Sequence, residues 1–118
     1  MTTIVVYSDE TDPDTRLAWK DISGALRNFV TPAYTMSVEV VNFADNTVEL
    51  AKTTGVTGGD GTGASNVNIA WTAAELAPLV GLSLRLRAKA VNGTELAVFT
   101  IDNRGSLPAL RVIPKPVP

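Results

Sequence analysis

The sequence predicts an all-β domain, an antiparallel immunoglobulin-like β-sandwich of about seven to eight strands with one short helical crossover. Three observations support this prediction. Apolar and polar residues alternate with period two along much of the 118-residue chain. Turn-forming residues separate the alternating segments, and a single short stretch carries the capping pattern of a helix.

The clearest strand begins at Leu82. Every even position from Leu82 to Ala90 is apolar and every odd position is polar, as expected for a strand with one buried face. The dipeptide Asn92-Gly93 follows, which suits the positive φ of a type I′ hairpin turn. The return strand is expected over Glu95–Ile101, which is rich in β-forming residues.

The same alternation recurs in other parts of the chain. Asp45-Asn46 separates two alternating segments and predicts a turn between them. A second turn is expected at 102–105, before the last strand. The remaining predicted strands are 4–7, 15–20, 34–40, 48–51, 67–71 and 107–113.

One segment reads as a helix. Thr72 and Glu75 have the spacing of a capping box, which predicts a helix over Thr72–Ala77. Pro78 and Gly81 end it within about one and a half turns. We therefore expect a short crossover between two strands.

Two segments are predicted to be irregular. Gly55–Ser65 contains five of the nine glycines and is expected to form a mobile loop. The tail 114–118 is proline-rich and expected to be extended. The chain thus divides into an N-terminal arm (1–14), the β-sandwich domain (15–113) and this tail.

The composition excludes several kinds of chemistry. The chain has no cysteine and no histidine, so disulfides, thiol nucleophiles and histidine-dependent catalytic triads are ruled out. With 10 basic and 12 acidic residues its net charge is −2, which argues against nucleic-acid binding. We therefore expect a protein that is not an enzyme, has no cofactor and holds no metal.

Targeting features are also missing from the sequence. Residues 1–7 carry no basic residue, and their apolar run ends at Ser8. No apolar stretch approaches the ~18 residues that a membrane-spanning helix needs. We expect a soluble protein made in a cytoplasm, with no membrane partner.

Two groups of residues are candidate protein contacts. The first is the glycine-rich loop, represented by Gly58, Gly59, Asp60 and Gly61. A phosphate cradle is not expected there, because no Gly-Lys-Ser/Thr follows. A calcium-binding glycine repeat has one imperfect copy, whereas such repeats function in stacks. We favour a flexible connection that becomes ordered against a partner.

The second group is a basic row on one strand face, formed by Arg85, Arg87 and Lys89. With Arg104 or Arg111 nearby it would suit phosphate or an acidic protein surface. The alternative is an ordinary solvent-exposed face in which the row pairs with Glu95 on the next strand. Of the functional uses, a protein–protein contact is favoured.

Acidic and aromatic residues offer weaker candidates. A cluster at Asp9, Glu10, Asp12 and Asp14 contains carboxylates suited to calcium, but it lacks the EF-hand glycine and closing glutamate, and a solvated turn is favoured. Trp71 continues an inward series and is expected in the core. Trp19 is expected in the core or an interface, in preference to a sugar-binding platform.

The succession of segments resembles a known family. The relevant stretches are Asp21–Gly24, Tyr34–Val40, Val48–Gly58 and Val67–Leu76. Their order resembles small β-sandwich domains of tailed bacteriophages, similar to the N-terminal domain of upper baseplate proteins and minor tail proteins of actinobacterial phages. The resemblance covers roughly residues 15–113, and its motifs describe a fold more than a site.

The resemblance implies a non-catalytic virion protein of the tail tip or baseplate, assembled in the bacterial host cytoplasm. Its partners would be other virion proteins of the tail, baseplate or capsid, or a second copy of the chain. One alternative is a decoration or cementing protein on the phage head. A further alternative is a receptor- or carbohydrate-binding module. These alternatives predict different locations and partners.

Overall fold

The structure is a computed structural model, and it describes residues 3–9, 13–21, 23–31, 33–93, 95–98 and 107–114. Its described part is mostly β-structure, which confirms the all-β prediction. The strands are β1 (Thr3–Tyr7), β2 (Asp14–Leu17), β3 (Thr35–Asn42), β4 (Val48–Lys52), β5 (Val56–Gly58), β6 (Val67–Ala70), β7 (Leu84–Asn92), β8 (Glu95–Val98) and β9 (Ala109–Ile113). The helix α1 (Ala73–Leu76) and the 3₁₀ turn η1 (Ala77–Leu79) lie between β6 and β7.

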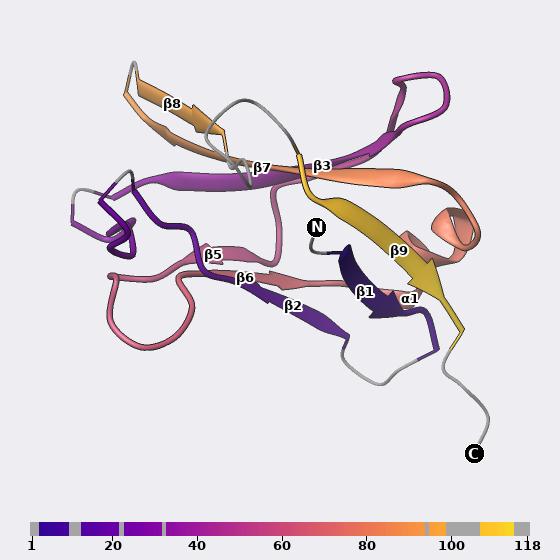
Figure 1. Ribbon diagram of the computed structural model, residues 1–118, viewed down its shortest axis with the longest axis horizontal. Coiled ribbons are helices and arrows are strands. Elements are labelled where there is room, and N and C mark those ends of the chain that lie inside the picture. Colours follow the sequence, from indigo (N-terminus) through magenta and orange to yellow (C-terminus); the bar gives the residue numbers. More distant parts are fainter. Residues whose placement is uncertain are drawn as a thin grey trace.

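The larger sheet has the strand order β1-β9-β7-β3-β4, and β8 pairs with the far end of β7. The prediction of a purely antiparallel fold was wrong at one pair. Strand β1 runs parallel to β9, with Thr3 opposite Ala109 (Figure 1). A parallel pair needs a long connection, and here nearly the whole chain provides it. The segment 1–14, expected as an arm, thus contributes an edge strand to this sheet.

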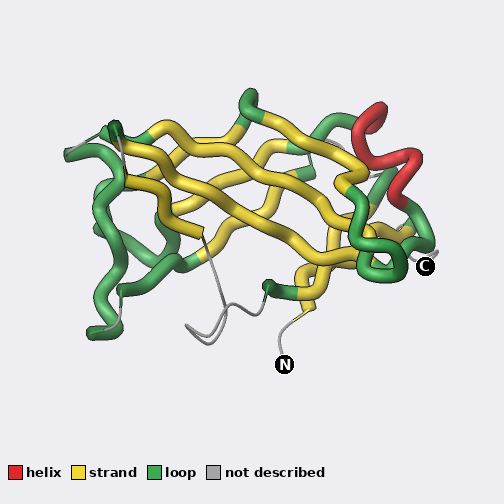
Figure 2. Tube along the Cα trace, turned by 90° about the horizontal axis from the view of Figure 1, so that it is seen from above, coloured by secondary structure: helices red, strands yellow, loops and turns green. Residues whose placement is uncertain are grey.

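The smaller sheet has the order β2-β6-β5, and both of its pairings are antiparallel. The two sheets form two layers (Figure 1), joined by one cluster of buried side chains from both. The molecule measures 41 × 30 × 25 Å. Seen from above, its long strands run along its length and the helical segment lies at one end (Figure 2).

The core follows from the alternation along the strands. In β7 the even positions from Leu84 to Ala90 are buried and the odd positions are partly or fully exposed, as predicted. Val38 and Val40 of β3 meet this face together with Val67 and Ile69 of the smaller sheet. Trp71, just beyond β6, continues the inward series and is buried, which confirms its predicted place in the core.

The predicted hairpin is present, but its turn is displaced by one residue. Asn92 pairs with Glu95, so Asn92 is the last residue of β7 and lies before the turn. Gly93 has a φ of 57°, which a glycine adopts at little cost. The end of the predicted return strand (99–101) and the turn at 102–105 lie outside the described residues.

The helical crossover is confirmed with both halves of its capping box. The backbone N–H of Glu75 donates to the Thr72 hydroxyl (3.2 Å), and the N–H of Thr72 donates to the Glu75 carboxylate (2.9 Å). Leu76 and Leu79 are buried beneath the helix and the following turn. The crossover therefore closes one end of the core.

The loop predicted from Gly55 to Ser65 was wrong over residues 56–58, which form β5. Val56 is buried and lies opposite Ile69 of β6. The carbonyl of Gly55 accepts a hydrogen bond from the Ala70 N–H (2.8 Å), which aligns the chain one residue before the strand begins. A three-residue strand with one large apolar side chain has too little alternation to be recognised among glycines.

Leu86 tests the packing at the centre of β7. Leu86→Ala should lower the free energy of unfolding by about 2–5 kcal/mol, because the side chain is fully buried and its removal leaves a cavity. Val91→Ala in the same strand is the control, since Val91 is 38% exposed, and it should cost less than about 1 kcal/mol. Chemical denaturation measures both. Equal losses would contradict the assignment of the two faces.

Candidate functional site

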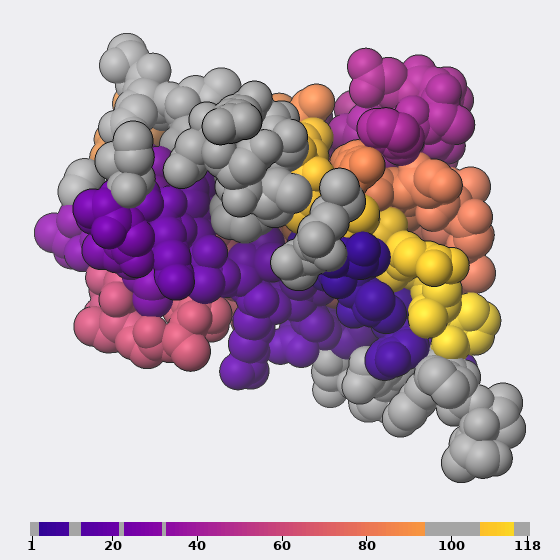
Figure 3. Space-filling view, viewed as in Figure 1, coloured from indigo at the N-terminus to yellow at the C-terminus, as the bar shows by residue number. Residues whose placement is uncertain are grey.

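The glycine-rich segment is packed against the loop that follows β2. A Cβ added to Gly58 would lie 2.6 Å from the Cβ of Phe29, so the close approach requires glycine. The N–H of Phe29 donates to the carbonyl of Gly59 (2.9 Å), and the Gly59 N–H donates to the carbonyl of Asn66 (2.8 Å). The two loops lie against each other at one end of the molecule (Figure 3). Gly58 and Gly59 therefore serve loop packing.

The tip of this segment is held by a local turn. The Asp60 carboxylate accepts hydrogen bonds from the hydroxyl (2.6 Å) and the backbone N–H (3.0 Å) of Thr62. The hydroxyl bond is the main cause of the lowered pKa of Asp60. Gly61 has a φ of 91°, and a Cβ there would lie 3.1 Å from the carbonyl oxygen of Leu26. The structure thus brings all four predicted loop contacts into one structured segment.

Asn66 joins these loops and was not singled out from the sequence. Its side chain accepts a hydrogen bond from the Trp19 N–H (2.6 Å) and donates to the carbonyl of Trp19 (2.8 Å). It also donates to the carbonyl of Arg27 (2.8 Å). Asn66 is only 2% exposed, and its amide accepts from the Trp19 N–H while it shares the Trp19 carbonyl with the N–H of Arg27. A single asparagine after a serine reads as an ordinary loop residue.

Trp19 is part of an aromatic cluster behind these loops. Its ring lies 5.0 Å from that of Phe29, which makes an edge contact with Tyr34 at 5.4 Å. The guanidinium of Arg27 lies 5.6–5.9 Å from all three ring centres. Trp19 is 5% exposed, in agreement with the core prediction, and its ring is not presented as an open platform for a sugar.

The three residues of the predicted basic row on β7 have different partners. Glu39 of β3 forms ion pairs with Arg87 (3.1 Å) and Lys89 (2.7 Å). The hydrogen bond from Lys89 is the main cause of the lowered pKa of Glu39, and Arg87 adds to it. These two cations thus share a carboxylate on the neighbouring strand. The side chain of Glu95, the partner expected from the sequence, lies outside the described residues.

Arg85 has a different environment from the rest of the row. Its guanidinium lies 4.6 Å from the ring centre of Phe43, a contact of the cation–π type. Phe43 is 63% exposed, so the pair stands at the surface of the larger sheet. Within the described part of the chain, no carboxylate forms an ion pair with Arg85.

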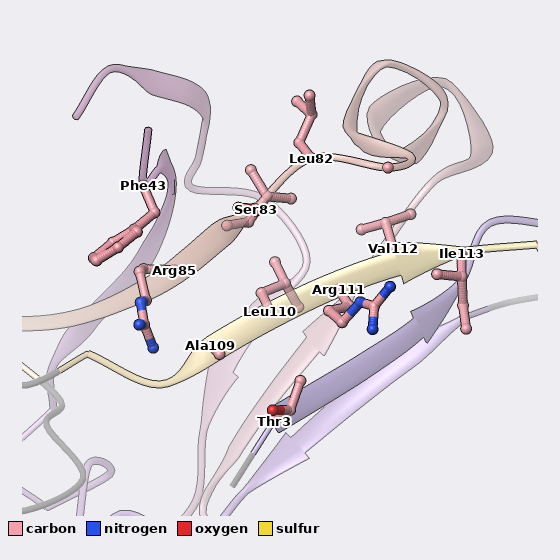
Figure 4. Close-up of a pocket in the computed structure, with 12 residues that line it drawn as sticks. Thr3, Phe43, Leu82, Ser83, Arg85, Ala109, Leu110, Arg111, Val112 and Ile113 are labelled. Carbon is pink, nitrogen blue, oxygen red and sulfur yellow. The ribbon is translucent and has the colours of Figure 1, made fainter. Parts of the chain in front are cut away.

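A groove of about 380 Å³ lies beside this pair (Figure 4). Strands β7 and β9 form its floor, and Arg85 and Arg111 stand on either side of Ala109. Phe43 and Thr3 line its margins. Among the described residues, those that line the groove include two arginines and no acidic residue. The sequence led us to expect Arg104 or Arg111 near the basic row. In the structure Arg111 lines the same groove as Arg85.

A buried ion pair lies on the face of β4 that points into the core, away from the groove. The Lys52 side chain is 4% exposed, and its ammonium contacts the Glu75 carboxylate at 2.8 Å. The ammonium also donates to the carbonyl of Ala70 and lies 5.2 Å from the centre of the Trp71 ring. The predicted strand ended one residue before Lys52, so the sequence did not indicate this inward-facing lysine.

Glu75 links this ion pair to the helix cap. Burial raises the pKa of its carboxyl group, but the hydrogen bonds from Lys52 and from the Thr72 N–H outweigh burial. The net effect is a pKa below its usual value. The ionised form therefore contributes to the stability of the fold.

The acidic N-terminal cluster is only partly described. Asp14 forms an ion pair with Arg16 (3.2 Å), while Glu10 and Asp12 lie outside the described residues. Within residues that the structure describes, no three acidic side chains are grouped to hold a metal ion. The same residues contain no helix long and apolar enough to cross a membrane.

Comparisons with known proteins gave no relative. No family model, no curated protein and no solved structure matches the chain.

The hydrogen bonds of Asn66 can be tested by removal. Asn66→Ala should lower the free energy of unfolding by about 2–4 kcal/mol, because the buried N–H of Trp19 loses its acceptor and the carbonyls of Trp19 and Arg27 each lose a donor. Asn28→Ala is the control, since the exposed Asn28 caps only its own turn, and it should cost below about 1 kcal/mol. Thermal or urea unfolding measures the difference. A loss for Asn66→Ala no greater than the control would contradict this role.

Glu75 should make stability depend on pH in the acid range. Because folding lowers its pKa from about 4.5, its contribution is complete above that pH and is lost as the pH falls through the folded value. Glu75→Gln should therefore cost about 1–2 kcal/mol at pH 7 and progressively less below pH ~4.

Urea unfolding of both proteins between pH 7 and pH 3 measures this convergence. Glu49→Gln removes the same charge from an exposed position and is the control. A constant difference between wild type and Glu75→Gln across the pH range would rule out the linkage.

Proposed function

We propose that this protein is a non-catalytic protein-binding module of a tailed-phage virion, with an immunoglobulin-like β-sandwich fold, located in the tail tip or baseplate. Its partners in this proposal are other virion proteins. The outer face of the larger sheet is the contact surface. The fold, the surface and the location have separate support.

The strand order supports the immunoglobulin-like fold. In that fold, strands G, F, C and C′ form one sheet of the variable type and strands B, E and D lie together in the other. The orders β9-β7-β3-β4 and β2-β6-β5 correspond to these sets when the strands are taken along the chain. Strand β1 then occupies the place of strand A, beside β9, and β8 is an added strand on β7.

The observation that carries the binding function is the exposed pair of Phe43 and Arg85. Aromatic and arginine side chains are enriched at the centres of protein interfaces. Phe43 is 63% exposed and its ring already holds the Arg85 guanidinium, so little side-chain freedom remains to be lost on binding. A large exposed aromatic ring arranged in this way is typical of an interface anchor.

The surrounding register extends this pair into a row of residues across the sheet, in which Val41 is covered. Backbone pairing places one row of residues across five strands of the larger sheet, on the face that bears Arg85. This row consists of Val48, Val41, Arg85, Ala109 and Thr3. Val48 is 48% exposed and adds apolar area on the side away from the groove. The surface thus combines apolar and basic parts, as protein-binding surfaces do.

The virion location is supported by the succession of sequence segments that resembles phage β-sandwich domains. The loop at Gly58–Gly61, expected to contact a partner, is instead tied to the loop after β2. We therefore assign the contact to the sheet face and leave the loop a structural role.

Copy number tests the location. Quantitative mass spectrometry of particles purified from the phage that encodes the chain should find a few copies per particle, the number typical of tail-tip and baseplate proteins. The major capsid and tail-tube proteins of the same particles provide the scale. Hundreds of copies would replace this location with that of a head decoration protein, and absence from particles would overturn the virion role.

A further inference from the structure

We propose that the groove between Arg85 and Arg111 binds an extended acidic segment of a partner protein, with one carboxylate at each arginine. This inference rests on the proposed role in protein–protein contact and adds the chemistry of the partner. It is carried by the position of the arginines, by the charges around them and by the shape of the groove floor.

The backbone register fixes the distance between the two arginines. Arg85 lies directly opposite Ala109 on the neighbouring strand β9. Arg111 is two residues further along β9 and thus on the same face, so it is the diagonal neighbour of Arg85. Diagonal neighbours in antiparallel strands lie roughly 7–8 Å apart, with their β-carbons somewhat closer. Figure 4 shows the two side chains on either side of Ala109.

The charges on the three middle strands of the larger sheet are unbalanced. Among described side chains on β3, β7 and β9 that bear charge, four are cationic and one is anionic. These are Arg85, Arg87, Lys89, Arg111 and Glu39. The single carboxylate is shared by Arg87 and Lys89. Arg85 and Arg111 therefore have no carboxylate as ion-pair partner among the described side chains, and they leave positive charge at the groove of a chain whose net charge is −2.

The groove floor admits an extended chain. Ala109, between the arginines, presents only a methyl group, and Thr3 lies next to it on β1. In an extended segment, side chains two residues apart point to the same side and are separated by about 6.6–6.8 Å. This spacing matches the diagonal separation of the arginines. A segment of the type Glu-Xaa-Glu thus places one carboxylate at each guanidinium, a geometry that permits bidentate hydrogen bonds.

A nucleic acid is less suited to this surface. Its phosphates would approach a protein of pI about 5.0 whose net charge repels a long polyanion. A short acidic protein segment meets the local positive charge without covering the acidic remainder of the molecule. The structure therefore favours carboxylates of a protein over a phosphate backbone.

The test is a titration of the ¹⁵N-labelled full chain with the peptide acetyl-Thr-Glu-Val-Glu-Thr-amide, followed by NMR. Saturable shifts are expected in the amides of groove residues, with Thr3, Ser83 and Ala109 as reporters. The peptide with both glutamates replaced by glutamine should give no saturable shifts there. Raising the salt concentration should weaken binding, because the contact is ionic and exposed.

A matched pair of variants locates the binding. Arg111→Gln should raise the dissociation constant about fivefold. Arg16→Gln, which removes the same charge from the exposed face of β2, should leave it within about twofold. Superimposable amide spectra of the free variants would show that both remain folded. If Arg111→Gln loses its fold, Arg85→Gln replaces it, with the same expected fivefold change.

Three results would overturn the proposal: equal binding of the glutamate and glutamine peptides, shifts distributed evenly over the surface, or tighter binding of a 12-base-pair DNA duplex in the same groove. The peptide titration and the mass spectrometry of virions can fail independently of each other. A protein found in particles whose groove ignores the peptide would retain its proposed function and lose this partner. Peptide binding by a protein absent from particles would do the reverse.

Discussion

The structure depends most on the pairing of β7 with its neighbours. This strand pairs with β3 along one edge and with β9 and β8 in succession along the other, so the larger sheet is organised around one stretch of backbone. Its alternation gives two surfaces at once. Leu86 and its even neighbours form the core, while the odd positions place arginine and lysine on the outer face. The core and the proposed contact surface therefore share one register, and a slip of one residue would exchange them.

The smaller sheet depends on hydrogen bonds of a different kind. Strand β2 ends at Leu17, and beyond it the side chain of Asn66 bonds both backbone groups of Trp19 as a neighbouring strand would. The same amide reaches the loop that carries Arg27. One buried polar side chain thus replaces a stretch of sheet and keeps the aromatic cluster in place. The glycines beside it permit the close approach of the loops.

Local patterns in the sequence predicted the local structure well and the long-range contacts poorly. The hairpin, the capped helix at Thr72 and the inward position of Trp71 each follow from residues near one another in the chain. The parallel pairing of β1 with β9 joins distant segments and leaves no periodic signal. The division of the basic row depends on the register of β3, which places Glu39 opposite Arg87. Individual buried polar residues such as Lys52 break the pattern by which strands are recognised.

The parallel pairing of β1 with β9 also affects when the larger sheet can be completed during folding. Thr3 leaves the ribosome early and Ala109 late, yet they lie side by side in the folded chain. Contacts of such high sequence separation form slowly. The groove takes lining residues from both strands, so its margin at Thr3 forms only when β1 pairs with β9. The surface that we propose for a partner is thus complete only after β1 and β9 have paired.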